Sequence, residues 1–356
     1  DKLGRKMSKS LGNSPDPLML IDKYGADGVR MGMMLSAPAG NDILFDEALC
    51  EQGRNFNNKI WNAFRLVKGW QVSDEMTQPA VNKIAVNWFN AKLKEVNAEM
   101  ELQFKGYRIS EALMTVYRLF WDEFSSWYLE MVKPAYGTPI DRATYEATLG
   151  FFDTLLKMLH PFMPFITEEL WQHLYEREQG ASIMRECLAL EGLSDGERAL
   201  LADIERVKQV IGGVRTIRNQ KNISPKEALT LQAVGEHHLA NYDSVVKKMA
   251  NLSQIEVVKE KSAEASAFMV STDEYAVPLG NLIDVKAEIE KAQAQLAEIE
   301  KAQAQLAHLE VRKKLANEKF VAHAPENVVA LERKKESDSL EKIAVLKQTI
   351  AELSKN

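Results

Sequence analysis

The stretch FNNKIWNAFRLV at residues 56–67 decides the fold class of this chain. Apolar residues recur along it at three- and four-residue spacing, which is the stripe of an amphipathic helix. They are Phe56, Ile60, Phe64 and Val67. The same pattern returns at residues 86–96, 113–127 and 155–159, before the prolines of residues 160–164 interrupt it. Helices with such stripes bury them against one another, so the sequence predicts a helix bundle over residues 46–193.

The segment after the bundle, residues 194–282, has a different pattern. A predicted helix over residues 196–218 is followed by three alternating, β-branched stretches at 228–234, 254–259 and 267–272. A short helix at residues 242–249 separates the first two stretches. This order predicts a small α+β domain.

The last segment, residues 283–356, contains a tandem repeat, because AEIEKAQAQL at 287–296 recurs at 297–306. Apolar residues at coiled-coil spacing form one seam over residues 285–306 and a second over 340–353. Turn-forming residues are concentrated at 317–325 between the seams. The segment is therefore predicted to be an antiparallel coiled-coil hairpin. Residues 1–45, with two short helices near 18–24 and 27–38, complete a mainly α chain.

Composition limits the possible classes of protein. The chain has 46% apolar and 27% charged residues, no apolar run long enough for a bilayer and no signal-peptide pattern, so we expect a cytoplasmic protein without a membrane partner. The net charge of −6 disfavours a uniformly basic nucleic-acid binder but allows local basic patches. Cys50 and Cys187 lie far apart and are expected to be reduced thiols in packed helices. No metal site is predicted. The first residue, Asp1, suggests a piece of a longer protein.

One loop carries a catalytic signal. Residues 4–13 read GRKMSKSLGN, with two lysines and two serines between Gly4 and Gly12. A mobile loop with two ammonium groups can close over a polyphosphate, because phosphoryl and nucleotidyl transfer need positive charge against the oxygens that become more negative. By composition alone the loop would fit a solvated linker better.

The string KMSKS (Lys6 to Ser10), with Pro15-Asp16-Pro17 and YGADGVR at 24–30, resembles the second signature of class I aminoacyl-tRNA synthetases. Further stretches resemble the valyl branch of that family, and the predicted terminal arm favours it over the isoleucyl and leucyl branches. These stretches are FNNKIWNAFR (56–65), FWDEFSSWYLEMVKP (120–134), LHPFMPFITEELW (159–171), IRNQKNISP (217–225), VPLGNLIDVKAE (277–288) and KLANEKFVAHAPENVV (314–329).

The resemblance implies a ligase that activates valine with ATP and transfers it to tRNA(Val). Lys9 would bind the ATP phosphates and stabilise the departing pyrophosphate, while Lys6 and Ser8 would shape the closed loop and Ser10 would add a further phosphate contact. Lys6 and Lys9 are the expected catalytic residues, and Mg²⁺ would arrive with the nucleotide. The bundle would bind the anticodon, and the hairpin would support the tRNA elbow.

The other ATP signature of the family, His-Ile-Gly-His, is not in the sequence. The valine and ATP core and the editing domain would therefore lie outside this chain. We expect the chain alone to bind no ATP and to be unable to activate valine.

Candidate tRNA contacts are clustered at the tip of the predicted hairpin. Residues 311–335 contain seven positive and three negative side chains on a chain that is acidic overall, which is the pattern of a phosphate-binding patch. The positive residues are Arg312, Lys313, Lys314, Lys319, Arg333, Lys334 and Lys335. Arg215 and Arg218 are further candidates, although a solvated helix face explains them equally well.

Aromatic residues give weaker signals. Residues 120–128 could form a base-stacking platform, but their helical spacing favours the core, and we expect the same of Trp61 and Trp171. His160 is expected to be packed or hydrogen-bonded rather than a ligand or a base.

Three alternatives remain open from the sequence. They are an isoleucyl-type relative, a stand-alone tRNA-binding module, and a structural coiled-coil protein that dimerises through its last segment. A hairpin that buries its own seam predicts a monomer instead.

Overall fold

The computed structural model describes residues 1, 3–37, 40 and 42–280 of the chain. Residues 1–262 and 267–277 form one compact unit, and residues 263–266 and 278–356 belong to a second unit. The predicted hairpin over residues 283–356 lies outside the described residues and stays a prediction. Among the residues that are described, no helix is long and apolar enough to cross a membrane.

The chain begins with short elements, as the sequence predicts. They are a 3-10 turn (Lys9–Leu11), α1 (Pro17–Tyr24) and α2 (Ala26–Leu35). The Asp16 carboxylate caps α1 by accepting a hydrogen bond from the backbone N–H of Leu18 at 2.9 Å. Gly25 ends the helix with a φ of 76°, a backbone angle that favours glycine. Strong caps therefore explain why so short a helix forms here.

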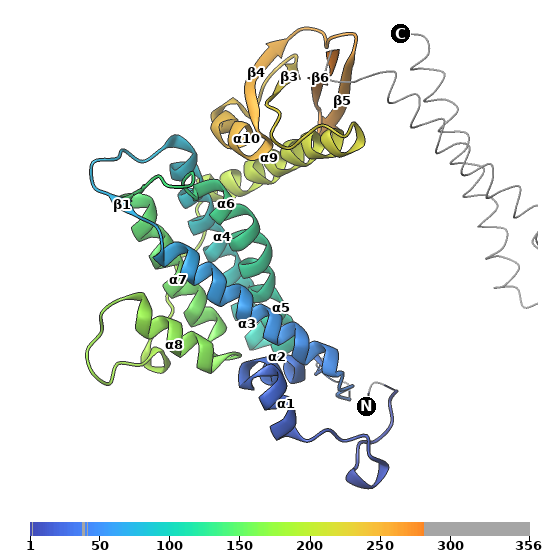
Figure 1. Ribbon diagram of the computed structural model, residues 1–356, viewed down its shortest axis with the longest axis vertical. Coiled ribbons are helices and arrows are strands. Elements are labelled where there is room, and N and C mark those ends of the chain that lie inside the picture. Colours follow the sequence, from blue (N-terminus) through green and yellow to red (C-terminus); the bar gives the residue numbers. More distant parts are fainter. Residues whose placement is uncertain (2, 38–39, 41, 281–356) are drawn as a thin grey trace, which may run out of the picture. The chain divides into compact units, whose positions relative to one another are not determined.

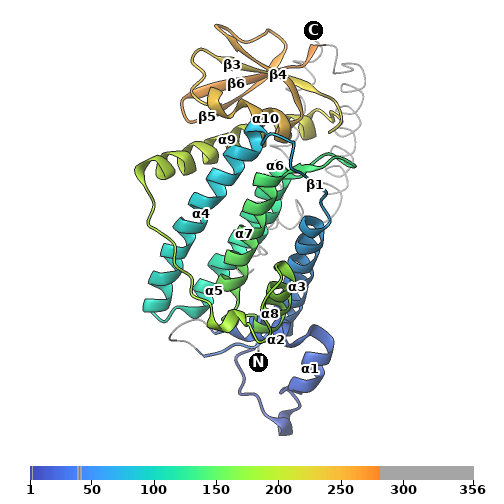
Figure 2. The same cartoon turned by 90° about the vertical axis from the view of Figure 1, so that its left-hand side faces the viewer.

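A helix bundle follows, and it confirms the predicted mainly α fold. Its elements are α3 (Glu47–Lys68), β1 (Val72–Ser73), α4 (Ala80–Lys105), α5 (Ile109–Arg118), a π-helical segment (Leu119–Tyr128), α6 (Leu129–Val132), β2 (Ile140–Asp141), α7 (Arg142–Leu159), α8 (Pro164–Leu174) and a 3-10 turn (Ile183–Arg185). Figure 2 shows α3, α4, α5 and α7 side by side along the bundle. All four stripe residues of α3, from Phe56 to Val67, are buried. The two short strands form one parallel pair.

The π-helical segment supplies the aromatic centre of the bundle. Phe120, Phe124 and Tyr128 are all fully buried, so the core interpretation of these residues is confirmed. They recur at intervals of four residues, so the three rings lie on one face of the segment. The rings of Phe124 and Tyr128 stack at 5.4 Å. The sequence predicted a helix here but not its π character.

Two predictions about single side chains are wrong. Trp61 is 42% exposed because it follows the buried Ile60 directly and therefore points about 100° away from the stripe of α3. Trp171, by contrast, is buried as predicted. Cys187 is exposed in an irregular segment after the second 3-10 turn, not in a packed helix. Cys50 is buried, and burial raises the pKa of its thiol.

The small α+β domain is present as predicted. Its elements are α9 (Asp195–Gln220), β3 (Leu229–Val234), a 3-10 turn (Ala240–Tyr242), α10 (Asp243–Ala250), β4 (Leu252–Val258), β5 (Ala265–Val270) and β6 (Asp273–Pro278). The sheet has the order β4-β3-β6-β5. Strands β3 and β4 are parallel, with α10 as their crossover, whereas β3 and β6 are antiparallel. Gly213 of α9 lies directly against the ring of Phe268 in β5, and Figure 1 shows α9 along the sheet.

Strand β6 was not predicted from the sequence. It starts with two acidic residues and ends at Pro278, which are weak strand formers. Its position between β3 and β5 buries Tyr275, Ala276 and Val277 all the same. Pairing on both sides therefore overrides the local propensity of this strand.

Helices α2 and α3 cross at glycine residues. A Cβ atom added at Gly53 would lie 2.6 Å from the carbonyl oxygen of Gly28 and 2.8 Å from its Cα. A Cβ at Gly32 would lie 2.7 Å from the backbone nitrogen of Cys50. The backbones of the two helices are therefore in direct contact, which fixes α2 on the bundle.

We expect Gly53→Ala to lower the free energy of unfolding by about 2 kcal/mol, because the new methyl group must push α2 away from α3. Gly150→Ala is the matched control, since nothing lies within 4 Å of a Cβ at that position of α7. The control should raise the free energy of unfolding by roughly 0.5–1 kcal/mol through helix propensity. Urea unfolding of both variants measures the difference, and equal stabilities would contradict the tight crossing.

Candidate functional site

The loop between Gly4 and Gly12 is ordered around a short helical turn. The Ser8 hydroxyl accepts a hydrogen bond from the backbone N–H of Leu11 at 3.2 Å and so caps the turn Lys9–Leu11. Gly12 ends the turn with a φ of 65°, in the left-handed region that glycine adopts freely. The hydroxyls of Ser8 and Ser10 lie 3.1 Å apart. The loop backbone therefore has a conformation that its own hydrogen bonds define.

Asn13 closes this loop from the inside. Its Oδ1 accepts a hydrogen bond from the backbone N–H of Ser8 at 2.9 Å, and its Nδ2 donates to the carbonyl of Lys6 at 3.2 Å. Nδ2 also donates to the carboxylate of Asp1 at 3.1 Å. This role of Asn13 was not predicted from the sequence. A usable signal was its place after Gly12, since asparagine beside a turn often bonds nearby backbone.

The loop carries three cationic side chains, and that of Arg5 is paired with the Asp1 carboxylate. Among the described residues, neither the ammonium of Lys6 nor that of Lys9 has a hydrogen bond or a carboxylate partner. Both side chains are exposed. A backbone fixed by Asn13 and Ser8 thus presents two unpaired positive charges, which is an arrangement that can bind polyphosphate oxygens.

The segment after the loop is fastened to α3. The Tyr24 hydroxyl donates to the Glu47 carboxylate at 2.7 Å, and the Lys23 ammonium donates to the same oxygen at 2.9 Å. The bond from Lys23 and then that from Tyr24 hold the pKa of Glu47 below its usual value. These contacts fix α1 at the start of the bundle.

The outer face of α3 is the second candidate site. No acidic residue occurs between Arg54 and Trp70, although four basic residues do. Trp61 is 42% exposed and Leu66 is 46% exposed on this face. Asn55, Asn58, Asn62 and Arg65 are also exposed, and within residues 42–280 no hydrogen bond occupies their side chains.

Such a face has the chemistry of a nucleic-acid interface. Amide groups can bond to the edges of unstacked bases, an aromatic ring can stack on them, and a guanidinium can bind phosphate or a base. We name the set Asn55, Asn58, Trp61, Asn62 and Arg65 the α3 face. This face was not predicted from the sequence, because Trp61 was expected in the core.

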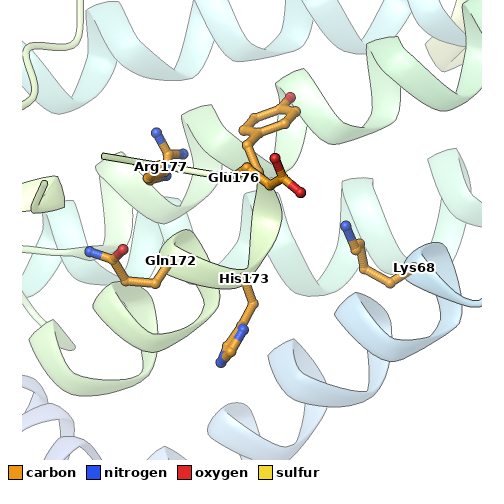
Figure 3. Close-up of a pocket in the computed structure, with 6 residues that line it drawn as sticks. Lys68, Gln172, His173, Glu176 and Arg177 are labelled. Atoms are coloured by element: carbon orange, nitrogen blue, oxygen red, sulfur yellow. The ribbon is translucent and has the colours of Figure 1, made fainter. Parts of the chain in front are cut away.

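A cavity of about 320 Å³ lies where α3 and α8 end, lined by Lys68, Gln172, His173, Tyr175, Glu176 and Arg177. Figure 3 shows Lys68 on α3, Gln172 and His173 on α8, and Glu176 and Arg177 in the segment that follows. The Lys68 ammonium donates to the carbonyl of Leu174 at 3.2 Å. The Arg177 guanidinium lies over the Trp171 ring and contacts the Asp153 carboxylate, so its charge is already paired. The cavity therefore combines donors, acceptors and the half-exposed Tyr175 ring.

The two arginines that were predicted to contact phosphate have different surroundings in the structure. Arg215 is exposed, donates to the carbonyl of Met249 at 3.0 Å and lies over the Trp127 ring, so it stays a candidate. Arg218 is 6% exposed and donates to the carbonyls of Ser224, Ala250 and Asn251. A guanidinium buried on three carbonyls cannot meet a phosphate, so this assignment of Arg218 was wrong.

The other predicted contacts, from Arg312 to Lys335, lie outside the described residues and stay predictions. His237 Nε2 contacts the Asp243 carboxylate at 2.7 Å, and His238 Nδ1 contacts Asp273 at 2.9 Å. In the described ranges no three histidine, cysteine or acidic side chains gather as metal ligands.

His160 is hydrogen-bonded, as predicted. Its Nδ1 lies 2.7 Å from the Thr167 hydroxyl, which itself donates to the carbonyl of Met163. Burial lowers the pKa of His160 below its ordinary value of 6.5, while Glu168 and Asp27 act in the opposite direction. The folded chain therefore favours the neutral imidazole.

This lowered pKa predicts a pH dependence of stability. The unfolded chain takes up the proton near the ordinary pKa, before the folded chain does, so stability should fall as the pH drops from neutrality to about 5. His160→Asn removes this contribution and should flatten the dependence. Thermal unfolding across that range measures it, and parallel profiles for variant and wild type would contradict the assignment.

Comparison with known proteins gives three family matches. The anticodon-binding domain of tRNA ligases matches residues 86–233, class I tRNA synthetases (I, L, M and V) match residues 1–46, and the valyl tRNA synthetase tRNA binding arm matches residues 284–354. A valine–tRNA ligase from Phocaeicola vulgatus is 62% identical over 355 residues, covering 100% of this chain and 40% of that protein. One from Parabacteroides distasonis is 61% identical over 355 residues, with the same coverage of 100% and 40%.

The chain thus spans about 40% of the length of the curated relatives it matches. Among solved structures, a ternary LeuRS–tRNA–LeuAMS complex from Agrobacterium radiobacter K84 aligns with a TM-score of 0.38 and 16% identity. That alignment covers 72% of this chain and 32% of the other, and at such a score it carries no argument.

Proposed function

Because the chain belongs to the valine–tRNA ligase family of class I aminoacyl-tRNA synthetases, we propose that it is the tRNA-holding part of such a ligase. In this role residues 1–45 border the ATP site, residues 46–193 bind the anticodon end, residues 194–282 form the small α+β domain and residues 283–356 form the tRNA-binding arm. The α3 face is the observation that supports tRNA binding most strongly.

In the proposed reaction, a carboxylate oxygen of valine attacks the α-phosphorus of ATP, and the bond from that phosphorus to pyrophosphate breaks. The terminal ribose hydroxyl of tRNA then attacks the valyl carbonyl, and AMP leaves. The free ammonium groups of Lys6 and Lys9 suit the first step, because they can stabilise the charge that grows on the departing pyrophosphate. Mg²⁺ would come with the nucleotide.

Residues 1–45 also carry apolar side chains that nothing in the described part of the chain covers. Such a density of exposed apolar groups is typical of a surface that packs against further protein. This supports a division of labour in which the valine and ATP core lies in another part of the ligase. The exposed residues are Leu3, Leu11, Leu18, Met19, Ile43 and Leu44.

The proposal is tested by binding of this chain to transcribed valine tRNA over a salt series, beside isoleucine tRNA and a valine tRNA with an exchanged anticodon. We expect valine tRNA to bind most tightly, the anticodon exchange to weaken it, and affinity to fall steeply with salt. Equal, weak binding of all three would overturn the proposed roles of bundle and arm. Valine-dependent ATP–pyrophosphate exchange by this chain alone would overturn the division of labour.

A further inference from the structure

The α3 face leads into the cavity that lies where α3 and α8 end. Lys68 follows Arg65 by three residues and Trp61 by seven, so the three side chains lie along one stripe of α3. Lys68 also lines the cavity, where its ammonium group donates to the carbonyl of Leu174. The cavity volume of about 320 Å³ is at the lower end of the range of ligand pockets, about 300–1,000 Å³. The proposed nucleic-acid surface thus ends in a cavity that can hold a single flat ring.

Arg177 makes one wall of this cavity rigid. Its guanidinium lies 3.1 Å from the centroid of the Trp171 ring, and its Nε donates to the carbonyl of Trp171 at 2.9 Å. The Asp153 carboxylate accepts hydrogen bonds from the Trp171 ring at 2.9 Å and from Arg177 at 3.3 Å. The centroid of the Tyr175 ring is 5.5 Å from the same guanidinium, and Tyr175 is 41% exposed. A preformed wall therefore presents an aromatic ring on which a base can stack.

Three polar groups of the cavity have unused hydrogen-bonding capacity. Within residues 42–280, no hydrogen bond or ion pair occupies the Glu176 carboxylate or the Tyr175 hydroxyl. The Gln172 amide nitrogen forms two hydrogen bonds inside the protein, which leaves the amide oxygen as a free acceptor. Figure 3 shows the Glu176 carboxylate and the Lys68 ammonium group directed towards the same space, although no ion pair joins these two side chains in the described part of the chain. The cavity therefore offers both an acceptor and a donor to a ligand.

The Glu176 carboxylate favours a base over a phosphate as that ligand. An acidic side chain beside a nucleic acid repels the phosphate backbone and lowers affinity. No acidic residue occurs on α3 between Arg54 and Trp70, so Glu176 is an exception at the end of a basic face. A carboxylate can, however, accept a hydrogen bond from the exocyclic amino group of a base, and an ammonium group can donate to an acceptor on the same base edge.

We infer that this cavity binds one unstacked base of tRNA that has an exocyclic amino group, with Tyr175 as the stacking ring, Glu176 as the acceptor and Lys68 as the donor. This inference rests on the proposed function and names a base-binding site within it. Uracil is disfavoured in the same orientation, because it presents a carbonyl oxygen where cytosine presents its amino group, and the carboxylate repels that oxygen. The cavity would therefore select the base at one position of the tRNA.

Glu176→Ala in this chain tests the inference by the sign of its effect. If Glu176 only adds negative charge, its removal strengthens the binding of valine tRNA or leaves it unchanged. If Glu176 binds a base, its removal weakens binding by about 10-fold. Glu178→Ala is the matched control, because Glu178 is an exposed acid that does not line the cavity, and this variant should not weaken binding. Both acids are exposed, so neither change should alter the thermal midpoint.

Removal of single amino groups from the tRNA identifies the base. Synthetic valine tRNAs carry one replacement each in the anticodon loop, with uracil for a cytosine, purine for an adenine or hypoxanthine for a guanine. We expect one of these replacements to weaken binding to the wild-type chain by about 10-fold. The same replacement should have no further effect on Glu176→Ala, because the contact is already lost in that variant.

Two results would overturn the inference. One is an affinity of Glu176→Ala for valine tRNA that equals or exceeds that of the wild type. The other is a set of replacements that affect the wild type and Glu176→Ala alike at every position. If the wild-type chain binds valine tRNA, isoleucine tRNA and the anticodon-exchanged tRNA equally weakly, the proposed function fails instead, so the two failures are distinguishable.

Discussion

In a ligase that contains this chain, Lys9→Ala lowers kcat for valine-dependent ATP–pyrophosphate exchange by roughly 10²–10³-fold, the loss expected when one charge-stabilising donor is removed from a transition state. Lys9 has no partner among the described residues, so its ammonium is available for the pyrophosphate. Because the side chain has no hydrogen bond or ion pair with the described residues, its removal should leave the thermal midpoint unchanged. The effect on kcat should therefore exceed any effect on KM for valine.

Two variants control this experiment. Lys83→Ala removes an exposed lysine from α4 and should keep the wild-type rate. Lys9→Arg keeps the positive charge but replaces the compact ammonium group with a planar guanidinium group. This variant should therefore retain only part of the wild-type rate. If Lys9→Ala lowers kcat by less than about threefold, the loss is far smaller than expected for a charge-stabilising donor. That result would exclude Lys9 from the proposed chemistry.

The double variant Trp61→Ala, Arg65→Ala should weaken binding of valine tRNA to this chain by roughly 100-fold. Stacking of one base on an aromatic side chain contributes about 1–3 kcal/mol, and an arginine contact to a base or phosphate contributes about as much. Both residues are exposed on α3, so neither change removes core packing. The loss should be accompanied by a smaller salt dependence, because one phosphate contact changes the slope by about one.

A matched double variant exists on another surface. Tyr107 is 84% exposed after α4, and Lys105 is the last residue of that helix. Tyr107→Ala, Lys105→Ala therefore removes the same kinds of side chain elsewhere and should keep the wild-type affinity. Equal losses for both doubles would indicate nonspecific electrostatic attraction and would argue against the α3 face as a recognition surface.

Much of the fold was predictable because local pattern and tertiary packing agree. The stripe from Phe56 to Val67 and the residues that cap α1 predict their helices from local sequence, and packing on the bundle agrees with them. The alternation in β3 and the short helix α10 likewise predict the α+β domain. The loop with Lys6 and Lys9 was predictable because the order of its residues is distinctive. Its composition alone would also fit a solvated linker.

The remaining features depend on contacts that no local pattern encodes. Trp61 is of a residue type that usually lies in a core. Its side chain is exposed only because it points away from the buried face of α3. Arg218 looks like a surface cation, but carbonyls from three other positions surround it. The Asp27 and Arg30 side chains of α2 form hydrogen bonds with backbone groups that are more than 130 residues away in sequence. Strand β6 forms through pairing on both sides despite weak propensity.

In the proposed function, the α3 face meets the anticodon end of tRNA. The most direct test replaces Trp61 with a photoreactive benzoylphenylalanine and maps the nucleotides that cross-link when this chain is bound to valine tRNA. We expect cross-links confined to the anticodon loop, which an excess of unlabelled valine tRNA abolishes. Cross-links in the acceptor stem, or spread evenly along the tRNA, would contradict this role of the α3 face.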